Sequence, residues 1–176
     1  MRADSRLGAA LLLLAAAPVL VACSSGSSAS TEAGTLHGPY PVTRSVDGDT
    51  IRVNRDGEEI VIRLIGLDTP ETVAPDRPVE CFGPEASART KGLVEGGQVW
   101  LEYDEVSGLT DKYDRTLAFV WLDQQTMLNE LLIREGFAEE VTYTDGYAHQ
   151  GEFRAAEDAA RAAGLGLWTA CAGEAQ

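Results

Sequence analysis

Side chains that could bind a cation and a phosphate lie in three separate segments of the sequence. Asp49 ends the Asp-Gly-Asp part of a Val-Asp-Gly-Asp-Thr segment, and Asp68 and Glu71 follow an apolar run that contains Arg63. Arg115 ends an Asp-Lys-Tyr-Asp-Arg segment. Taken singly, these segments are typical of a turn, of an arginine on the solvent face of a half-buried strand, and of a solvated loop. Their chemical interest lies in their combination.

The second segment favours a hard cation. Asp68 and Glu71 are three residues apart, and Pro70 stiffens the chain between them. Two carboxylates held close together repel each other unless a cation relieves the repulsion. The nearby ligand atoms are all oxygens, with no His or Cys beside them, which favours Ca²⁺ or Mg²⁺ over zinc.

The elements that must position these residues are five strands and three helices. Alternating apolar residues, β-branched runs and Asp-Gly turns predict strands, and apolar residues at helical spacing before glycine predict helices. We expect strands at 40–46, 50–53, 60–65, 99–103 and 116–122, and helices at 84–95, 126–135 and 152–163. A helix after the third of five strands is the order of the oligonucleotide/oligosaccharide-binding (OB) barrel. The predicted fold class is therefore α+β, a five-stranded OB-type β-barrel with three α-helices.

The first part of the chain is typical of an export signal. Residues 1–22 have a basic start and an apolar run, and the Leu-Val-Ala-Cys sequence ending at Cys23 resembles a bacterial lipoprotein lipobox. We expect a signal peptide at 1–22, a lipid-anchored flexible tether at 23–37, a folded domain at 38–172 and a tail at 173–176. The alternative is an ordinary cleaved signal in which Cys23 is incidental. The lipid would be the only contact of the domain with the membrane.

The two other cysteines, Cys81 and Cys171, are candidates for a disulfide because disulfides persist outside the cytoplasm. Such a bond would close a loop of about 90 residues and add about 4–5 kcal/mol in the chain-entropy model. Two buried free thiols are the alternative.

The chain is strongly acidic, with a formal net charge of −14. Residues 1–22 carry Arg2, Arg6 and Asp4, so their removal changes the charge to −14 − (+2 − 1) = −15. The acidity therefore belongs to the mature part. By itself it argues against a nucleic-acid partner, because phosphate binding usually requires a basic surface.

Five motifs nonetheless occur in one order that resembles the staphylococcal nuclease (thermonuclease) family. They are Val-Asp-Gly-Asp-Thr, Arg-Leu-x-Gly-x-Asp-Thr-Pro-Glu, Gly-Pro-Glu-Ala-Ser-Ala, Asp-Lys-Tyr-x-Arg and a late Leu-Trp. The resemblance as a whole extends over residues from about 40 to 169. One departure is Asp114, at a position where the family often has glycine. A carboxylate beside Arg115 is expected to weaken substrate capture.

The resemblance implies a role for each matching residue. Calcium would be bound by the carboxylates of Asp49 and Asp68 and by the main-chain carbonyl of Thr69. Arg63 and Arg115 would bind the scissile phosphate. Glu71 would orient or deprotonate the attacking water. The nucleotide would be contacted by Lys112, Tyr113 and, with a register that slips by one residue, Tyr143.

The function implied is that of a calcium-dependent extracellular nuclease that hydrolyses DNA and RNA, favours single strands and leaves 3′-phosphate ends. We expect a monomer on the outer face of the cell membrane, anchored or released. Two alternatives are a non-catalytic OB-fold lipoprotein that binds oligonucleotide or protein, and a structural envelope lipoprotein. The first would be favoured by the loss of Arg63, Glu71 or Arg115, all of which are present.

Overall fold

The computed structural model describes residues 34–72, 78–143 and 146–173. The predicted signal peptide, Cys23, the tether up to residue 33 and the tail from residue 174 lie outside the described residues. In the part of the chain that is described, no helix has the length and apolar character needed to cross a bilayer.

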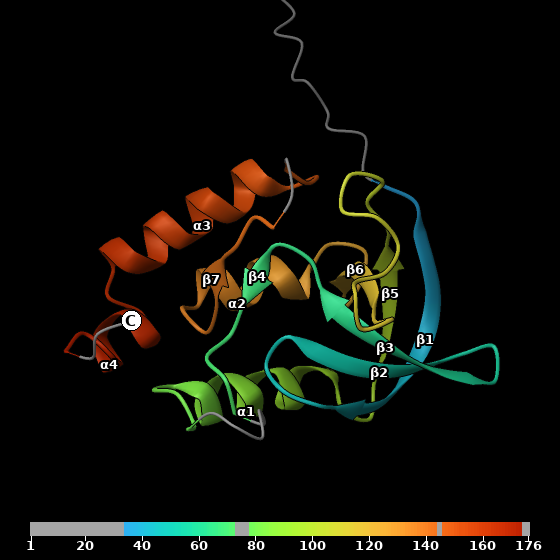
Figure 1. Ribbon diagram of the computed structural model, residues 1–176, viewed down its shortest axis with the longest axis horizontal. Helices are drawn as coiled ribbons and strands as arrows, with labels where there is room; N and C mark the ends of the chain where they lie inside the picture. Colours follow the sequence, from blue (N-terminus) through green and yellow to red (C-terminus); the bar gives the residue numbers. More distant parts are fainter. Residues whose placement is uncertain (1–33, 73–77, 144–145, 174–176) are drawn as a thin grey trace, which may run out of the picture. The chain divides into compact units, whose positions relative to one another are not determined.

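A closed five-stranded barrel forms the centre of the fold (Figure 1). Its strands are β1 (Leu36–Ser45), β2 (Thr50–Arg55), β3 (Glu58–Leu64), β5 (Gln98–Glu102) and β6 (Thr116–Trp121). All neighbouring pairs are antiparallel except β3 and β6, which run parallel and close the barrel. This arrangement confirms the predicted barrel, although β1 begins two residues before the expected domain start at Gly38.

The hairpin between β2 and β3 shows how the sequence sets the barrel register. Asp56 and Gly57 both have positive φ, 56° and 96°, as a tight two-residue hairpin requires. The main-chain N–H of Gly57 donates to the Asn54 side chain at 2.8 Å. With this turn fixed, Ile51 pairs with Ile62, and both side chains are buried in the barrel. The register also places Arg63 opposite Thr50 at the end of the hairpin.

Among the described residues, four helices accompany the barrel: α1 (Gly83–Val94), α2 (Leu128–Arg134), α3 (Gln150–Ala162) and α4 (Leu167–Ala170). The first three were predicted. The fourth has only four residues, and the two-residue strands β4 (Leu67–Asp68) and β7 (Glu139–Glu140) form a further small sheet. Elements this short carry no periodic pattern, so the sequence did not predict them.

Two buried polar side chains tie the helices to the loops that carry the motifs. Asn129 of α2 donates to the carbonyl of Ile65 at 2.9 Å, and its Oδ1 accepts from the N–H of Val120 at 2.8 Å. Thr90 of α1 donates to the carbonyl of Gly48 at 2.7 Å. Because buried polar groups need partners, these bonds fix the ends of β3 and the turn before β2.

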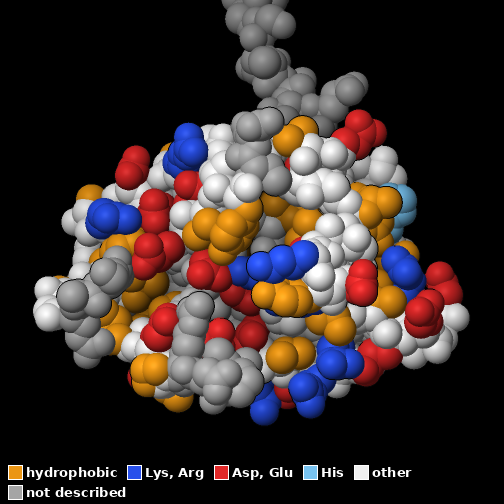
Figure 2. Space-filling view, viewed as in Figure 1, with side chains coloured by type: hydrophobic (Ala, Val, Ile, Leu, Met, Phe, Trp, Pro, Cys, Tyr) orange, Lys and Arg blue, Asp and Glu red, His pale blue; other side chains and the backbone are white. Residues whose placement is uncertain are grey.

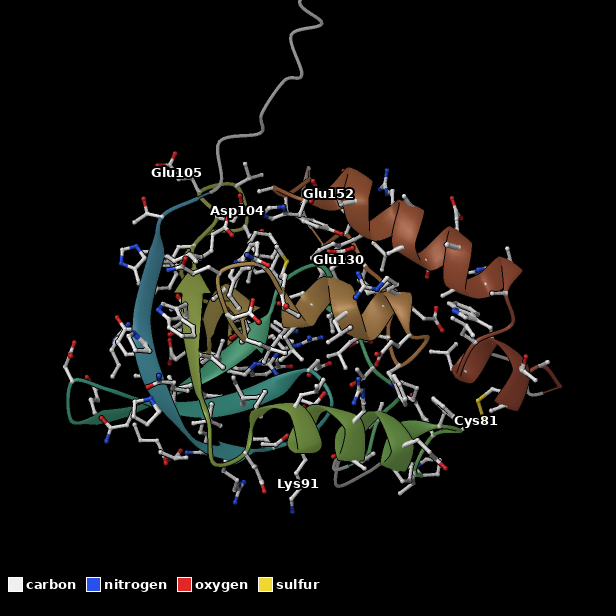
Figure 3. The ribbon with its side chains drawn as sticks, turned by 180° about the vertical axis from the view of Figure 1, so that it is seen from behind. Cys81, Lys91, Asp104, Glu105, Glu130 and Glu152 are labelled. Atoms are coloured by element: carbon white, nitrogen blue, oxygen red, sulfur yellow. A yellow bond between two sulfur atoms is a disulfide. The ribbon has the colours of Figure 1, made fainter. Side chains whose placement is uncertain are left out.

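A disulfide joins Cys81 and Cys171, with Cα atoms 5.9 Å apart, and so confirms the predicted pair. It connects the segment before α1 to the residue after α4 (Figure 3). The covalent link therefore holds the C-terminal end of the fold against α1.

Candidate active site

Arg63, at the end of β3, brings the first two motifs together. The residue is only 8% exposed, which rules out the solvent-facing arginine considered from sequence. Its Nη1 lies 3.0 Å from Asp49 Oδ2, and its Nη2 lies 2.7 Å from Asp68 Oδ1. The same guanidinium donates to the main-chain carbonyls of Leu64 and Leu67. The buried guanidinium of Arg63 thus holds together two carboxylates from segments that are far apart in the sequence.

The Asp49 carboxylate is fixed from both sides. Its Oδ1 accepts a hydrogen bond from the Thr50 hydroxyl at 2.8 Å, and its Oδ2 accepts from the N–H of Thr69 at 3.4 Å. Asp49, Thr50 and Thr69 are all buried. The three residues expected to bind a cation, Asp49, Asp68 and Thr69, are therefore neighbours in the structure.

Negative charge is in excess around Arg63. Burial, the charge of Asp49 and a hydrogen bond with it raise the pKa of Asp47 to about 7. Burial also raises the pKa of Asp68 to about 6, with Arg63 opposing and Asp49 adding to the shift. Asp47 belongs to the first motif but had no expected role. Its place beside the main-chain N–H of Asp49, 3.2 Å from Asp47 Oδ1, was not evident from spacing.

This donor set fits a hard cation. Two carboxylates contact a single guanidinium, a third carboxylate, that of Asp47, lies beside Asp49, and carboxylate oxygens are the ligands that Ca²⁺ prefers. Among the residues described, no three Asp, Glu, His or Cys side chains are already arranged as ligands. A cation here would depend on two carboxylates, a main-chain carbonyl and water, which is the composition of a weak site.

Glu71 is held through a mutual contact with Glu80. The N–H of Glu71 donates to Glu80 Oε2 at 2.9 Å, and the N–H of Glu80 donates to the carbonyl of Glu71, also at 2.9 Å. The Glu71 carboxylate accepts from the N–H of Thr72 at 2.9 Å. Glu80 was not predicted as a functional residue, because only the folded loop shows that it holds Glu71.

The second arginine, Arg115, is positioned by Asp111. Its Nε and Nη2 each lie 2.7 Å from Asp111 Oδ2. Asp111 Oδ1 accepts from the N–H groups of Tyr113 and Arg115 at 2.9 and 3.0 Å. One carboxylate thus shapes the loop and orients the guanidinium, a role that sequence reasoning missed.

A cavity of about 500 Å³ is lined by residues of both the second and the third motif. We call it the clamp cavity, and its walls include both arginines and the three residues expected to contact a nucleotide: Arg63, Arg115, Lys112, Tyr113 and Tyr143. Figure 2 shows basic side chains near the centre of one face, bordered by acidic and hydrophobic ones. Basic side chains therefore form a local cluster on a strongly acidic protein.

Aromatic side chains line the clamp cavity at several depths. Tyr113 and Tyr143 are 67% and 73% exposed, as befits groups that could stack on a base. Although most of the ring is exposed, partial desolvation of the hydroxyl and the charge of Asp68 raise the pKa of Tyr143. Tyr147, which was not predicted, lines the same cavity and donates from its hydroxyl to Glu140 at 2.8 Å. Burial and this bond raise the pKa of Tyr147.

The sequence profile of staphylococcal nuclease homologues matches residues 61–170. The thermonuclease of Staphylococcus hyicus is 43% identical over 130 residues, 74% of this chain and 75% of the relative. The chain belongs to the staphylococcal nuclease family. The thermonuclease of Staphylococcus intermedius is 42% identical over 129 residues, 73% of this chain and 75% of that relative. Endonuclease YncB of Bacillus subtilis is 37% identical over 127 residues, 72% of this chain but 59% of its own length.

The structure gives a physical reason for this chain's departure from the staphylococcal nuclease pattern at Asp114. The residue has a φ of 60°, in the left-handed region that glycine adopts at little cost. Aspartate tolerates this region better than most residues, and the exposed side chain of Asp114 adds a negative charge beside Arg115. The substitution therefore preserves the turn while it changes the charge at the clamp cavity.

Proposed function

We propose that this protein is a calcium-dependent nuclease that hydrolyses phosphodiester bonds of DNA and RNA. The observation that supports the proposal most is the clamp cavity, because it joins two fixed guanidinium groups to a carboxylate pair suited to a hard cation. The relatives named thermonuclease and endonuclease support the same reaction class.

The roles proposed for the side chains follow from their chemistry. Arg63 and Arg115 bind the scissile phosphate and stabilise the negative charge that builds on its oxygens during attack, since guanidinium groups bind such oxygens in pairs and keep their charge. Glu71 accepts a proton from the attacking water. Lys112, Tyr113 and Tyr143 hold the adjoining nucleotide. The calcium would be bound by Asp49, Asp68 and the Thr69 carbonyl.

Calcium, when bound, supplies Lewis-acid stabilisation and lowers the pKa of water. This help matters because an ordinary glutamate, with a pKa of about 4.3, is a weak base at neutral pH. Product ends with a 3′-phosphate and a preference for single strands complete the proposal. These two properties and the monomeric state are proposed from the resemblance to the staphylococcal nuclease family.

The place of action is proposed from the first part of the sequence. A signal peptide at 1–22, acylation of Cys23 and a tether to residue 37 would hold the enzyme on the outer face of the membrane, from which it could be released. The Cys81–Cys171 disulfide supports an oxidising compartment. Mass spectrometry of the exported protein tests the anchor, and an unmodified Cys23 would refute acylation while leaving the nuclease proposal intact.

Digestion of labelled single-stranded DNA and RNA tests the activity. We expect cleavage with calcium and none with chelator. Arg115→Lys keeps the charge but loses the paired guanidinium donors, so we expect kcat to fall by about 10²-fold or more. Glu58→Gln, at an exposed position of the β2–β3 hairpin, is the control and should retain the full rate. Equal inactivity of the unmodified protein with calcium and with chelator would refute the proposal.

A further inference from the structure

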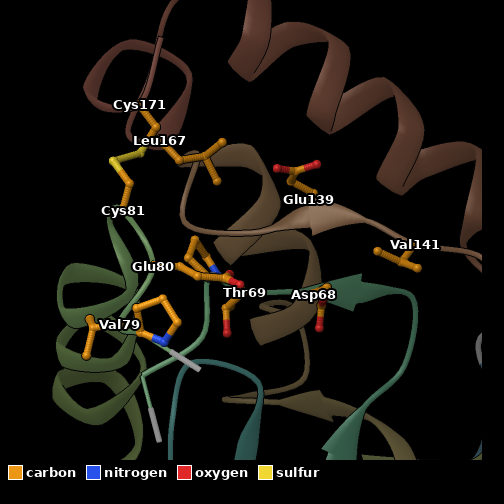
Figure 4. A pocket seen from close by; sticks show the side chains of 11 residues that line it. Asp68, Thr69, Val79, Glu80, Cys81, Glu139, Val141, Leu167 and Cys171 are labelled. Atoms are coloured by element: carbon orange, nitrogen blue, oxygen red, sulfur yellow. A yellow bond between two sulfur atoms is a disulfide. The ribbon is translucent and has the colours of Figure 1, made fainter. Parts of the chain in front are cut away.

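A second cavity of about 500 Å³ adjoins the clamp cavity on the other side of Asp68. We call it the disulfide cavity, because the Cys81–Cys171 bond forms part of its wall (Figure 4). Figure 4 shows the disulfide and Leu167 at one end and Val141 at the other. Val141 lines both cavities, and Asp68 of this cavity is bonded to Arg63 of the clamp cavity. The two cavities are therefore neighbours that share Val141 and are linked by the ion pair between Arg63 and Asp68.

A nucleic-acid chain must continue in both directions from the phosphate held at Arg63 and Arg115. The clamp cavity can hold the nucleoside on one side only. The nucleoside on the other side needs a second place close to the same arginine, and the disulfide cavity is close to it because Asp68 in its wall contacts Arg63. Its volume is within the usual range for a small-ligand site.

The wall chemistry indicates which part of that nucleoside enters. Pro70, Val79, Leu167 and the disulfide offer apolar surface for the face of a ring. The polar wall comprises Thr69 and the carboxylates of Asp68, Glu80 and Glu139, and none of the described residues that line the cavity is Lys or Arg. Such a wall repels phosphate and accepts hydrogen bonds from the amino group of a base, as carboxylates do in base recognition.

We infer that the disulfide cavity is a base-binding subsite, specific for a nucleobase with an exocyclic amino group, on the side of the scissile phosphate opposite the clamp cavity. The inference rests on the proposed nuclease function and extends it to sequence preference. Adenine, cytosine and guanine carry the amino donor, whereas thymine and uracil do not. Glu139 is the acceptor that is best suited to a test, because Asp68 belongs to the cation site and Glu80 holds Glu71.

The test uses the exported protein and short DNA strands with one phosphodiester, all other linkages being methylphosphonates. The bases on the two sides of that bond are changed independently to adenine, cytosine, thymine or an abasic unit. On one side we expect kcat/KM to be about tenfold higher for adenine or cytosine than for thymine, the effect of one hydrogen bond to a charged acceptor, and lowest for the abasic unit. On that same side, Glu139→Gln should reduce the amino-group preference to about twofold or less and leave the abasic penalty in place.

Glu58→Gln removes one negative charge from the exposed hairpin and is the matched control, which should keep the preference. Cleavage that is indifferent to the bases on both sides would overturn the subsite while supporting the nuclease. An amino-group preference that survives in Glu139→Gln would also overturn it. Failure to cleave any strand would instead refute the proposed function.

Discussion

At the scale of single residues, Asp114 combines two costs in one position. Its left-handed conformation is one that glycine adopts more readily, and its charge lies next to Arg115 in sequence. We predict that Asp114→Gly raises the free energy of unfolding by up to about 1 kcal/mol, measured by urea denaturation. It should also lower KM for single-stranded DNA at low salt, because a repulsive charge is removed.

Asp114→Asn separates the two effects. Asparagine also tolerates the left-handed region but has no charge, so it should lower KM as glycine does without the same gain in stability. Wild-type KM in both variants would show that this carboxylate does not influence substrate capture.

The sequence predicted residue types at the site better than it predicted their partners. Asp49, Asp68 and Arg63 were identified as a cation-binding and phosphate-binding set, and the structure brings them into contact. The pairing of Arg115 with Asp111 was missed, because the loop contains two aspartates and spacing alone does not select one. Only the folded loop shows that Asp111 faces the guanidinium.

At the scale of elements, His149 joins α3 to the barrel. The side chain of His149 is only 9% exposed. Nε2 lies 3.1 Å from Glu102 on β5, and Nδ1 lies 2.7 Å from Glu152 on α3. Glu102 also accepts from the Trp121 indole at 2.8 Å. The sequence does not reveal this contact, because Glu102 is far from His149 in the chain and only the fold brings the two side chains together.

This contact makes stability depend on pH. Hydrogen bonds to Glu102 and Glu152 raise the pKa of His149 above 6.5 despite burial, so the stabilisation is complete below pH 6.5 and is lost as the pH rises through the folded value. Burial opposes but does not prevent a lowered pKa at Glu102, where bonds from His149 and Trp121 favour the charged form. Its contribution is present above pH 4.5 and is lost as the pH falls through the folded value.

We therefore predict that His149→Gln destabilises the protein most between about pH 4.5 and 6.5, by about 1–3 kcal/mol, and less as the pH rises above this window. Urea denaturation at a series of pH values measures the difference. His37→Gln, at an exposed position of β1, is the matched control. A difference that is constant from pH 5 to pH 9 would contradict the protonated contact.

At the scale of the whole molecule, the Cys81–Cys171 disulfide closes a long loop of the chain. Cys81 and Cys171 are 90 residues apart in sequence. Replacing both by serine should lower the free energy of unfolding by about 4–5 kcal/mol in the chain-entropy model, measured in guanidinium. Reduction of the wild type should give a similar loss, and the double variant should not respond to reductant. A loss below about 1 kcal/mol would contradict a stabilising role.

Net charge was the property of the whole sequence that argued against a phosphate-binding site. A formal charge of −14 argues against a polyanionic partner, yet Arg63, Lys112 and Arg115 line one cavity. Composition averages over the surface, whereas a phosphate is bound by the few groups within reach. The barrel was predictable because strand periodicity is local, but the gathering of these cations depended on the closure of β3 against β6.

The two ion pairs of Arg63 have a thermodynamic consequence. A cation at Asp49 and Asp68 would compete with the guanidinium for the same oxygens, and the guanidinium so released would be available to an incoming phosphate. Occupancy of one site then raises affinity at the other, and by linkage the two enhancement factors must be equal. Cooperativity of this kind would let an acidic protein remain weakly attached to nucleic acid until both the ion and the strand are at hand.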